Sequence, residues 1–180
     1  MKIILAMAVS AIVLGAAASA FAAGNTSATT ATVTTTIIRP ISVTKNTDLK
    51  FGTIVRPSTS SGTVALSTTN VPTVTGTGAI LLPSSTTSAA NFTVSGEGGQ
   101  AFTLVIDPTV TLTNTATSGG TLTVTTVNDA ACTTACALSG ALGDVANGAK
   151  VVNVAGSFPL TSLTNTGAYA GTMNVSVTYN

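Results

Sequence analysis

The chain has 180 residues, of which 6% are charged and none is histidine, and its formal net charge is +1. With so few and so evenly balanced charges, the sequence lacks the cluster of basic residues that binding to nucleic acid or to an anionic membrane surface would need. Hydrophobic residues make up 44% of the chain and Thr about a fifth, and with 17 Gly and 6 Pro this composition predicts an all-β domain with many turns.

The first 22 residues are typical of a secretion signal. Lys2 gives a positive start, residues 3–14 form an apolar run, and the small residues Ala20 and Ala22 place cleavage before Ala23. The segment is too short and too weakly flanked for a stable membrane span. We therefore expect export through the inner membrane, with a transient periplasmic stage.

An extended N-terminal arm, residues 23–40, is expected to follow the signal. Within it, residues 28–38 have a strand pattern that places Ala31, Val33, Thr35 and Ile37 on one face. Such an arm can complete the sheet of a neighbouring copy through backbone hydrogen bonds and side chains that fill pockets. It can equally be the first strand of its own domain. Pro40 is a hinge in the first case and an edge-strand stop in the second, and the pattern does not separate the two.

Short strand patterns fill the rest of the chain, residues 41–180, and Pro and Gly separate most of them. They cover residues 41–44, 49–55, 63–66, 79–82, 91–95, 101–106, 110–113, 122–127, 151–154, 158–163 and 170–179. Pro72 and Gly156 are among the expected strand breaks. About ten to twelve short strands with this punctuation predict one antiparallel β-sandwich domain.

Two glycine-containing segments have a simple structural interpretation. In residues 49–55, Leu49 and Phe51 are expected to share a buried face, with Thr53 as a further candidate, and Gly52 indicates a bulge or a close backbone approach. Residues 95–100 form a glycine-rich turn. A phosphate-binding loop would need a helix after it, but a strand pattern follows, which favours a hairpin connection.

Cys132 and Cys136 are the only two cysteines of the chain. No imidazole is present to complete a metal site, so a local disulfide in an oxidising compartment is the favoured interpretation. A disulfide that closes so small a loop would fix the conformation of the loop but would not hold the fold together. A redox-active pair is the alternative, although no nearby group would lower a thiol pKa. Residues 130–150 are the least strand-like part of the chain and are expected to form a loop with one helical turn.

The sequence provides little for catalysis, and we expect neither an enzyme nor a cofactor. It has no histidine, only five acidic residues in separate loops, and no Gly-x-Ser-x-Gly motif. Asp129 and Asp144 with loop carbonyls are a thin candidate for a calcium site.

The C-terminal residues alternate strictly between apolar and polar side chains. Met173, Val175, Val177 and Tyr179 are expected on the buried face of a strand, where they would help to line a groove. These four residues are the candidate acceptor for the arm, from this chain or the next.

Three stretches resemble the secreted bacterial domain family DUF4402. They are residues 40–44 with 49–55, residues 92–97 leading to 102–106, and residues 167–172 running into 175–179. The resemblance spans nearly the whole mature chain and implies an immunoglobulin-like, pilin-like β-sandwich from a Gram-negative bacterium. It implies no activity, because the family has no assigned function. Residues 130–148, with the cysteine pair, have no counterpart in the family pattern.

These observations lead to two functional hypotheses. The first is a structural subunit of an extracellular fibre or pilus at the cell surface, which polymerises through its arm. Its partners would be copies of itself, with a periplasmic chaperone and an outer-membrane usher as candidate partners. The second is a monomeric secreted or surface adhesin that binds carbohydrate. Sugar sites usually have aromatic platforms, and two Tyr and five Phe provide few of them.

Overall fold

The computed structural model describes residues 27–180 except residues 84, 117–118, 131–135 and 144–147. This part of the chain contains thirteen β-strands, and all their pairings are antiparallel. The predicted all-β antiparallel class is therefore confirmed. The predicted secretion signal lies outside the described residues. Within them there is no helix, and hence none with the length and apolarity to cross a membrane.

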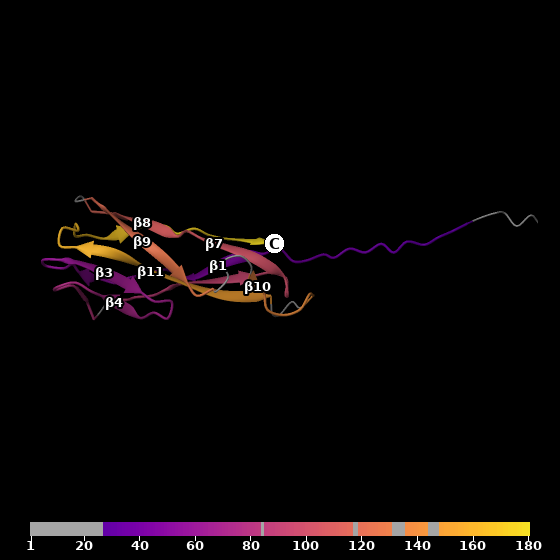
Figure 1. The fold of residues 1–180 in the computed structure, drawn as a ribbon, viewed down its shortest axis with the longest axis horizontal. Coiled ribbons are helices and arrows are strands. Elements are labelled where there is room, and N and C mark those ends of the chain that lie inside the picture. The colour runs from indigo at the N-terminus through magenta and orange to yellow at the C-terminus, as the bar shows by residue number, and fades with distance from the viewer. Residues whose placement is uncertain (1–26, 84, 117–118, 131–135, 144–147) are drawn as a thin grey trace, which may run out of the picture. The chain divides into compact units, whose positions relative to one another are not determined.

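All thirteen strands belong to one compact unit, residues 37–180, and the described residues before Ile37 belong to a second unit. The larger sheet of the strand-containing unit has eight strands, several of which are labelled in Figure 1. Its order is β1 (Ser42–Thr47), β6 (Ala90–Ser95), β11 (Ala149–Thr161), β9 (Thr121–Asn128), β8 (Thr109–Asn114) and β12 (Tyr169–Ala170), with β3 (Ser61–Leu66) added to β11 and β4 (Pro72–Val74) added to β3.

Two smaller sheets complete the unit. One has the order β10 (Cys136–Ala137), β7 (Ala101–Ile106) and β13 (Val175–Tyr179), and the other pairs β2 (Ile54–Val55) with β5 (Ile80–Leu81). Only Asp107 and Pro108 separate β7 from β8, so one run of chain passes from the small sheet into the large one. The β12 and β13 strands follow this run on its other side. As a result β1 is an edge on one side of the assembly, and β12 and β13 are edges on the other; β4 and β10 are further edge strands among the described residues.

The core consists of three apolar clusters, each built from alternate residues of the strands. The first contains Val64, Val110, Val124, Phe158 and Leu160; the second Ala90, Phe92, Ala130, Val152 and Val154; the third Val94, Phe102, Cys136 and Leu138. The β6 strand illustrates the pattern, because its burial alternates residue by residue. The first cluster lies within the eight-stranded sheet, whereas the third joins that sheet to the three-stranded one.

The prediction of strand breaks at Gly156 and Pro72 was wrong. Gly156 lies inside β11, a single strand of 13 residues that merges the two predicted strands 151–154 and 158–163. A Cβ atom on Gly156 would lie only 2.6 Å from the carbonyl oxygen of Thr125 on β9. Glycine is therefore needed here for a close approach of two backbones, not for a turn. Pro72 begins the short β4 strand, where proline is tolerated.

Candidate functional site

An open apolar groove lies between two segments of the strand-containing unit. Its volume is about 1130 Å³, and residues 45–56 form one wall and residues 164–173 the other. Its floor consists mainly of residues of the first core cluster and of apolar side chains next to it. These floor residues are Val110, Leu112, Leu122, Val124, Phe158 and Leu160. Ala90 and Phe92 of the second cluster also line the floor. We call this hollow the groove.

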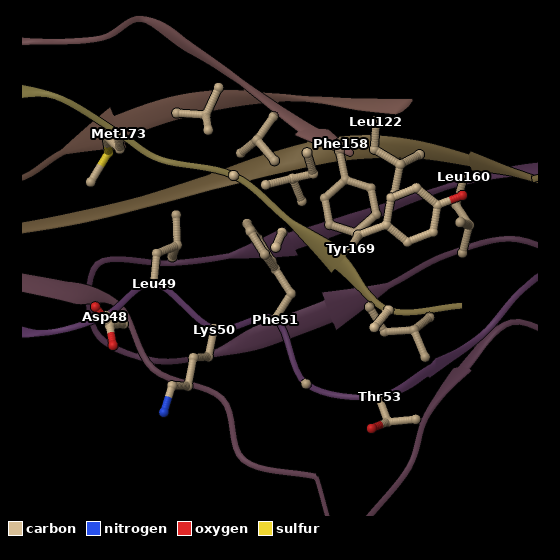
Figure 2. Close-up of a pocket in the computed structure, with 18 of the residues that line it drawn as sticks. Asp48, Leu49, Lys50, Phe51, Thr53, Leu122, Phe158, Leu160, Tyr169 and Met173 are labelled. Carbon is tan, nitrogen blue, oxygen red and sulfur yellow. The ribbon is translucent and has the colours of Figure 1, made fainter. Parts of the chain in front are cut away.

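The first wall contains residues 49–55, the segment in which Leu49 and Phe51 were expected to share a buried face. Leu49 and Phe51 point into the groove while Lys50 points away from it (Figure 2). The Phe51 ring meets the Phe158 ring edge to face, with the ring centroids 5.0 Å apart and the planes at 90°. This arrangement is the favoured one for two aromatic rings. The predicted common face of Leu49 and Phe51 therefore lines the groove.

Gly52 changes the alternation of this wall. Its φ angle is +81°, a left-handed conformation that favours glycine, and a Cβ atom there would lie 2.7 Å from the hydroxyl oxygen of Ser85. After Gly52 the pattern is shifted by one residue, so that Thr53 is exposed and Ile54 packs against the first cluster. The prediction of Thr53 as a further residue of the buried face was therefore wrong, because the left-handed backbone at Gly52 shifts the alternation and leaves Thr53 exposed.

Tyr169 and Met173 belong to the second wall (Figure 2). Met173 packs against the first and second clusters, and the Tyr169 hydroxyl donates a hydrogen bond to the Asn165 carbonyl at 2.8 Å. Gly171 lies between them, and any side chain there would collide with the Thr111 carbonyl oxygen. This wall therefore sits tightly on β8.

The four C-terminal candidate residues all lie on the half-buried face of their segment, but they occupy different places. Met173 lines the groove, and Val175 lines a smaller adjoining hollow of about 330 Å³ with Val43. Val177 and Tyr179 pack against the third cluster instead. Within the part of the chain that the structure describes, β13 pairs only with β7, and its other edge carries no strand.

Charged groups stand at the rim of the groove. Lys45 Nζ donates to Asp48 Oδ1 at 2.6 Å, and this bond, followed by the Lys45 charge, holds the pKa of Asp48 below its usual range. Arg56 Nη1 donates to the Thr164 carbonyl at 2.6 Å and so connects the two walls at one end. Since the floor is apolar, an occupant would need an apolar inner face.

A buried carboxylate forms the centre of a second arrangement. Glu97, 3% exposed, accepts hydrogen bonds from the backbone N–H of Arg39 (3.2 Å), the Arg39 Nε (3.1 Å) and the backbone N–H of Gly143 (2.5 Å). The Tyr179 hydroxyl accepts from the Glu97 N–H at 2.6 Å and donates to the Arg39 carbonyl at 3.0 Å. We call Arg39, Glu97 and Tyr179 the clamp.

Sequence reasoning missed the clamp. It treated residues 95–100 only as a hairpin connection, which leaves Glu97 without a role. The available signal was a lone carboxylate between glycines in a chain with very few charges. In the structure Gly96 leaves space for the Tyr179 hydroxyl, which a side chain at that position would displace.

The Glu97 carboxylate should make stability depend on pH. The hydrogen bond from Gly143 and then that from the Arg39 N–H lower the pKa of Glu97; burial acts against them, and the Arg39 side chain lowers the pKa further. A carboxyl group with a lowered pKa in the folded state stabilises the fold above its ordinary pKa, and this contribution disappears as the pH falls through the lowered value. The melting temperature of Glu97→Gln should therefore be lower than that of the wild type at neutral pH, and the difference between the two melting temperatures should become smaller at acidic pH. A gap that stays constant in thermal melts across this range would show that the charge is not the cause.

The predicted arm residues belong to no strand of the described chain. Residues 27–41 carry no regular secondary structure, and the Val33 and Ile37 side chains are 93% and 88% exposed. Ala31 and Thr35 are exposed as well. The choice between pairing within the chain and pairing with a neighbour stays a prediction.

The cysteine prediction is tested only in part. Cys136 is buried in the third cluster at the start of β10 and is not a free cysteine. Cys132 lies outside the described residues, so a disulfide between the two stays a prediction. In segment 130–150 a loop with one helical turn was expected. Among its described residues, 138–143 and 148 belong to no strand, as a loop requires, whereas Cys136–Ala137 form β10, residues 149–150 begin β11, and none is helical.

The described aspartates serve local structure. Asp107 accepts hydrogen bonds from the backbone and side-chain nitrogens of Asn174, and Asp129 does the same for Asn153. Asp144, the second candidate calcium ligand, lies outside the described residues. Among the residues that are described, no three His, Cys, Asp or Glu side chains come together as a metal site would require.

Comparison with known proteins gives one match. The family model described as "Domain of unknown function (DUF4402)" matches residues 41–179. No curated protein and no solved structure matches the chain. The match begins directly after Pro40, so it includes both walls of the groove and leaves out the arm.

Proposed function

We propose, for a chain that belongs to the DUF4402 family, that it is a structural subunit of an extracellular bacterial fibre whose copies join by strand complementation. The observation that carries this proposal is the groove. It lies over the floor of the core, between two segments that no strand of the described residues bridges, next to edges of β1, β12 and β13 that are unpaired within those residues. An added strand would cover apolar surface and gain backbone hydrogen bonds at the same time.

The arm has the properties that such an occupant needs. Ala31, Val33, Thr35 and Ile37 alternate with polar residues, and residues 24–38 contain no charge. Seven extended residues span about 23 Å at about 3.3 Å each, comparable with the six-residue run from Leu49 to Ile54 along the first wall. Burying Val33 and Ile37 would contribute about 1.5–3 kcal/mol each before the cost of ordering the arm.

The cellular setting belongs to the same proposal. Residues 1–22 act as a secretion signal, Cys132 and Cys136 form a disulfide after export, and the subunit ends at the cell surface. An apolar groove open to water invites aggregation, so a periplasmic chaperone that covers it before assembly fits this route. An outer-membrane usher would then pass the subunits outward.

The competing hypothesis of a carbohydrate-binding adhesin finds less support in the groove. Its floor is mostly aliphatic, and the Phe51 and Phe158 rings are paired edge to face with each other. Sugar sites instead present ring faces together with convergent polar groups. Screening purified monomer against a glycan array, with electron micrographs of the same sample, separates the two hypotheses.

The direct test places a charge on the apolar face of the arm. Ile37→Asp should abolish the ladder of SDS-resistant multimers in surface extracts, because the carboxylate would have to enter an apolar groove. Thr36→Asp is the matched control, with the same charge one residue earlier on the polar face, and it should keep the ladder. Equal amounts of the secreted variants exclude a defect in export. A ladder that survives Ile37→Asp would refute the proposal.

A further inference from the structure

The clamp connects the edge strand β1 with the edge strand β13 at one end of the groove. Ser42 of β1 pairs with Ser95, and Tyr179 of β13 pairs with Phe102, so β1 begins where β13 ends. There the Tyr179 hydroxyl donates directly to the Arg39 carbonyl. The buried Glu97 carboxylate holds the same arginine through its backbone and its side chain. We call this side of the groove the clamp end.

The opposite side of the groove has a much weaker closure. The hydrogen bond from Arg56 Nη1 to the Thr164 carbonyl crosses it, and this bond is exposed. An exposed bond of this kind competes with hydrogen bonds to water, and a surface arginine can turn away into solvent. We call this side the open end.

The clamp also fixes the root of the arm. The N–H and the carbonyl of Arg39 are both engaged, and residues 37–41 contain neither a turn nor a bend. Arg39 precedes Pro40, which restricts it to extended conformations, and Ile41 packs against the third cluster. The arm therefore cannot reverse at its root into its own groove while the clamp is closed. A reversal further up the arm would place Thr35 and Ile37 in the turn and remove them from the apolar face.

We infer that the clamp sets the polarity of assembly: the arm of a second copy enters the groove at the open end, with its N-terminal tip leading towards the clamp end. This inference rests on the proposed function. The incoming strand then runs antiparallel to β12 and β13, as in all ten strand pairs of the described residues. It runs parallel to β1 and to the first wall, so its backbone hydrogen bonds are expected at the β12 and β13 edge, where the slightly more stable antiparallel pairing is available.

This polarity decides the symmetry of the product. Each subunit gives its arm at the clamp end and receives one at the open end, a head-to-tail contact that does not close on itself. Entry at the clamp end would instead let two copies exchange arms reciprocally and stop as a dimer. The clamp residues are thus positioning residues for an open-ended polymer.

Cysteine crosslinking in the full chain reads the polarity directly. In fibres of a variant with Thr36→Cys and Thr53→Cys, oxidation should give multimers that survive boiling in SDS and disappear on reduction. Thr53 is exposed on the first wall near the open end. The matched variant with Thr36→Cys and Lys45→Cys, which places the second thiol near the clamp end, should not crosslink. The reverse pattern would overturn the inference. A wild type that forms no SDS-resistant ladder at all would refute the proposed function instead.

Loosening the clamp tests its role. Tyr179→Phe keeps the ring on the third cluster and removes the hydroxyl that bonds to Glu97 and Arg39. We expect most of the ladder to be replaced by monomers whose groove holds their own arm and by dimers that exchange arms. Their melting temperature should equal that of the fibre, and they should not form longer multimers at higher protein concentration. Ser58→Ala, which removes a hydroxyl bond to the Thr77 carbonyl, is the control and should keep the ladder. An unchanged ladder for Tyr179→Phe, or a monomer that melts low, would show that the clamp does not direct assembly.

Discussion

Deletion of residues 28–38 should convert the multimer ladder into a monomer of reduced stability. The deletion removes the only segment proposed to cover the groove and leaves the strand-containing unit, residues 37–180, almost entire. The half-buried Leu112 and Leu122 at the groove would then stay uncovered in every subunit. Multimers are measured by SDS electrophoresis without boiling, and stability by thermal melting of the monomer.

A synthetic peptide with the sequence of residues 28–38 provides the matching rescue. Added to the deletion variant, it should raise the melting temperature, because a ligand that binds only the folded state stabilises it by about 2.7 kcal/mol at a concentration one hundred times its Kd. The same peptide with Ile37→Asp is the control and should have little effect. Complete multimers after the deletion, or equal stabilisation by both peptides, would contradict strand complementation.

The second large effect is expected at the floor of the groove. Phe158 is 5% exposed, belongs to the first cluster and meets the Phe51 ring edge to face. Phe158→Ala would remove this contact and leave a cavity under the groove, so we expect a loss of about 3–5 kcal/mol in the free energy of unfolding. Leu163→Ala, at a site 86% exposed, is the control and should change stability by less than about 0.5 kcal/mol.

Chemical denaturation of the monomeric Ile37→Asp background measures this difference without interference from assembly. The same samples should show weaker binding of the arm peptide to Phe158→Ala than to Leu163→Ala. A Phe158→Ala variant as stable as its control would mean that the floor of the groove is not part of the core.

Much of the fold could be predicted from the sequence because the apolar and polar residues of many strands alternate, as the burial of β6 shows. The pattern over residues 91–95 and that over 101–106 were sufficient to place β6 and β7. Alternation could not reveal that β11 continues through Gly156, because the need for glycine there comes from the close approach of the neighbouring β9 backbone and not from the pattern of its own segment. The same limit applies to β4 and β10, which are two or three residues long and form only beside their partners.

The sequence could predict that the candidate site is an apolar groove, but not which residues form its walls. The sequence indicated a groove beside the C-terminal strand, and Met173 does line one. The opposite wall and the role of Tyr179 depend on contacts between residues far apart in the chain, such as the hydrogen bond from Tyr179 to Arg39. The shift from Thr53 to Ile54 depends on the φ angle of one glycine, which composition and spacing do not specify.

The length of β11 has a consequence for the order in which the chain can fold. This strand pairs with β6, β9 and β3, all of which precede it in the sequence. Before β11 has been synthesised, β6 can pair only with β1, β3 only with β4 and β9 only with β8. Contacts that span so much sequence form slowly, because the loops between them must close first. The chain therefore stays without its central strand until late in synthesis, a state compatible with passage through a membrane before folding.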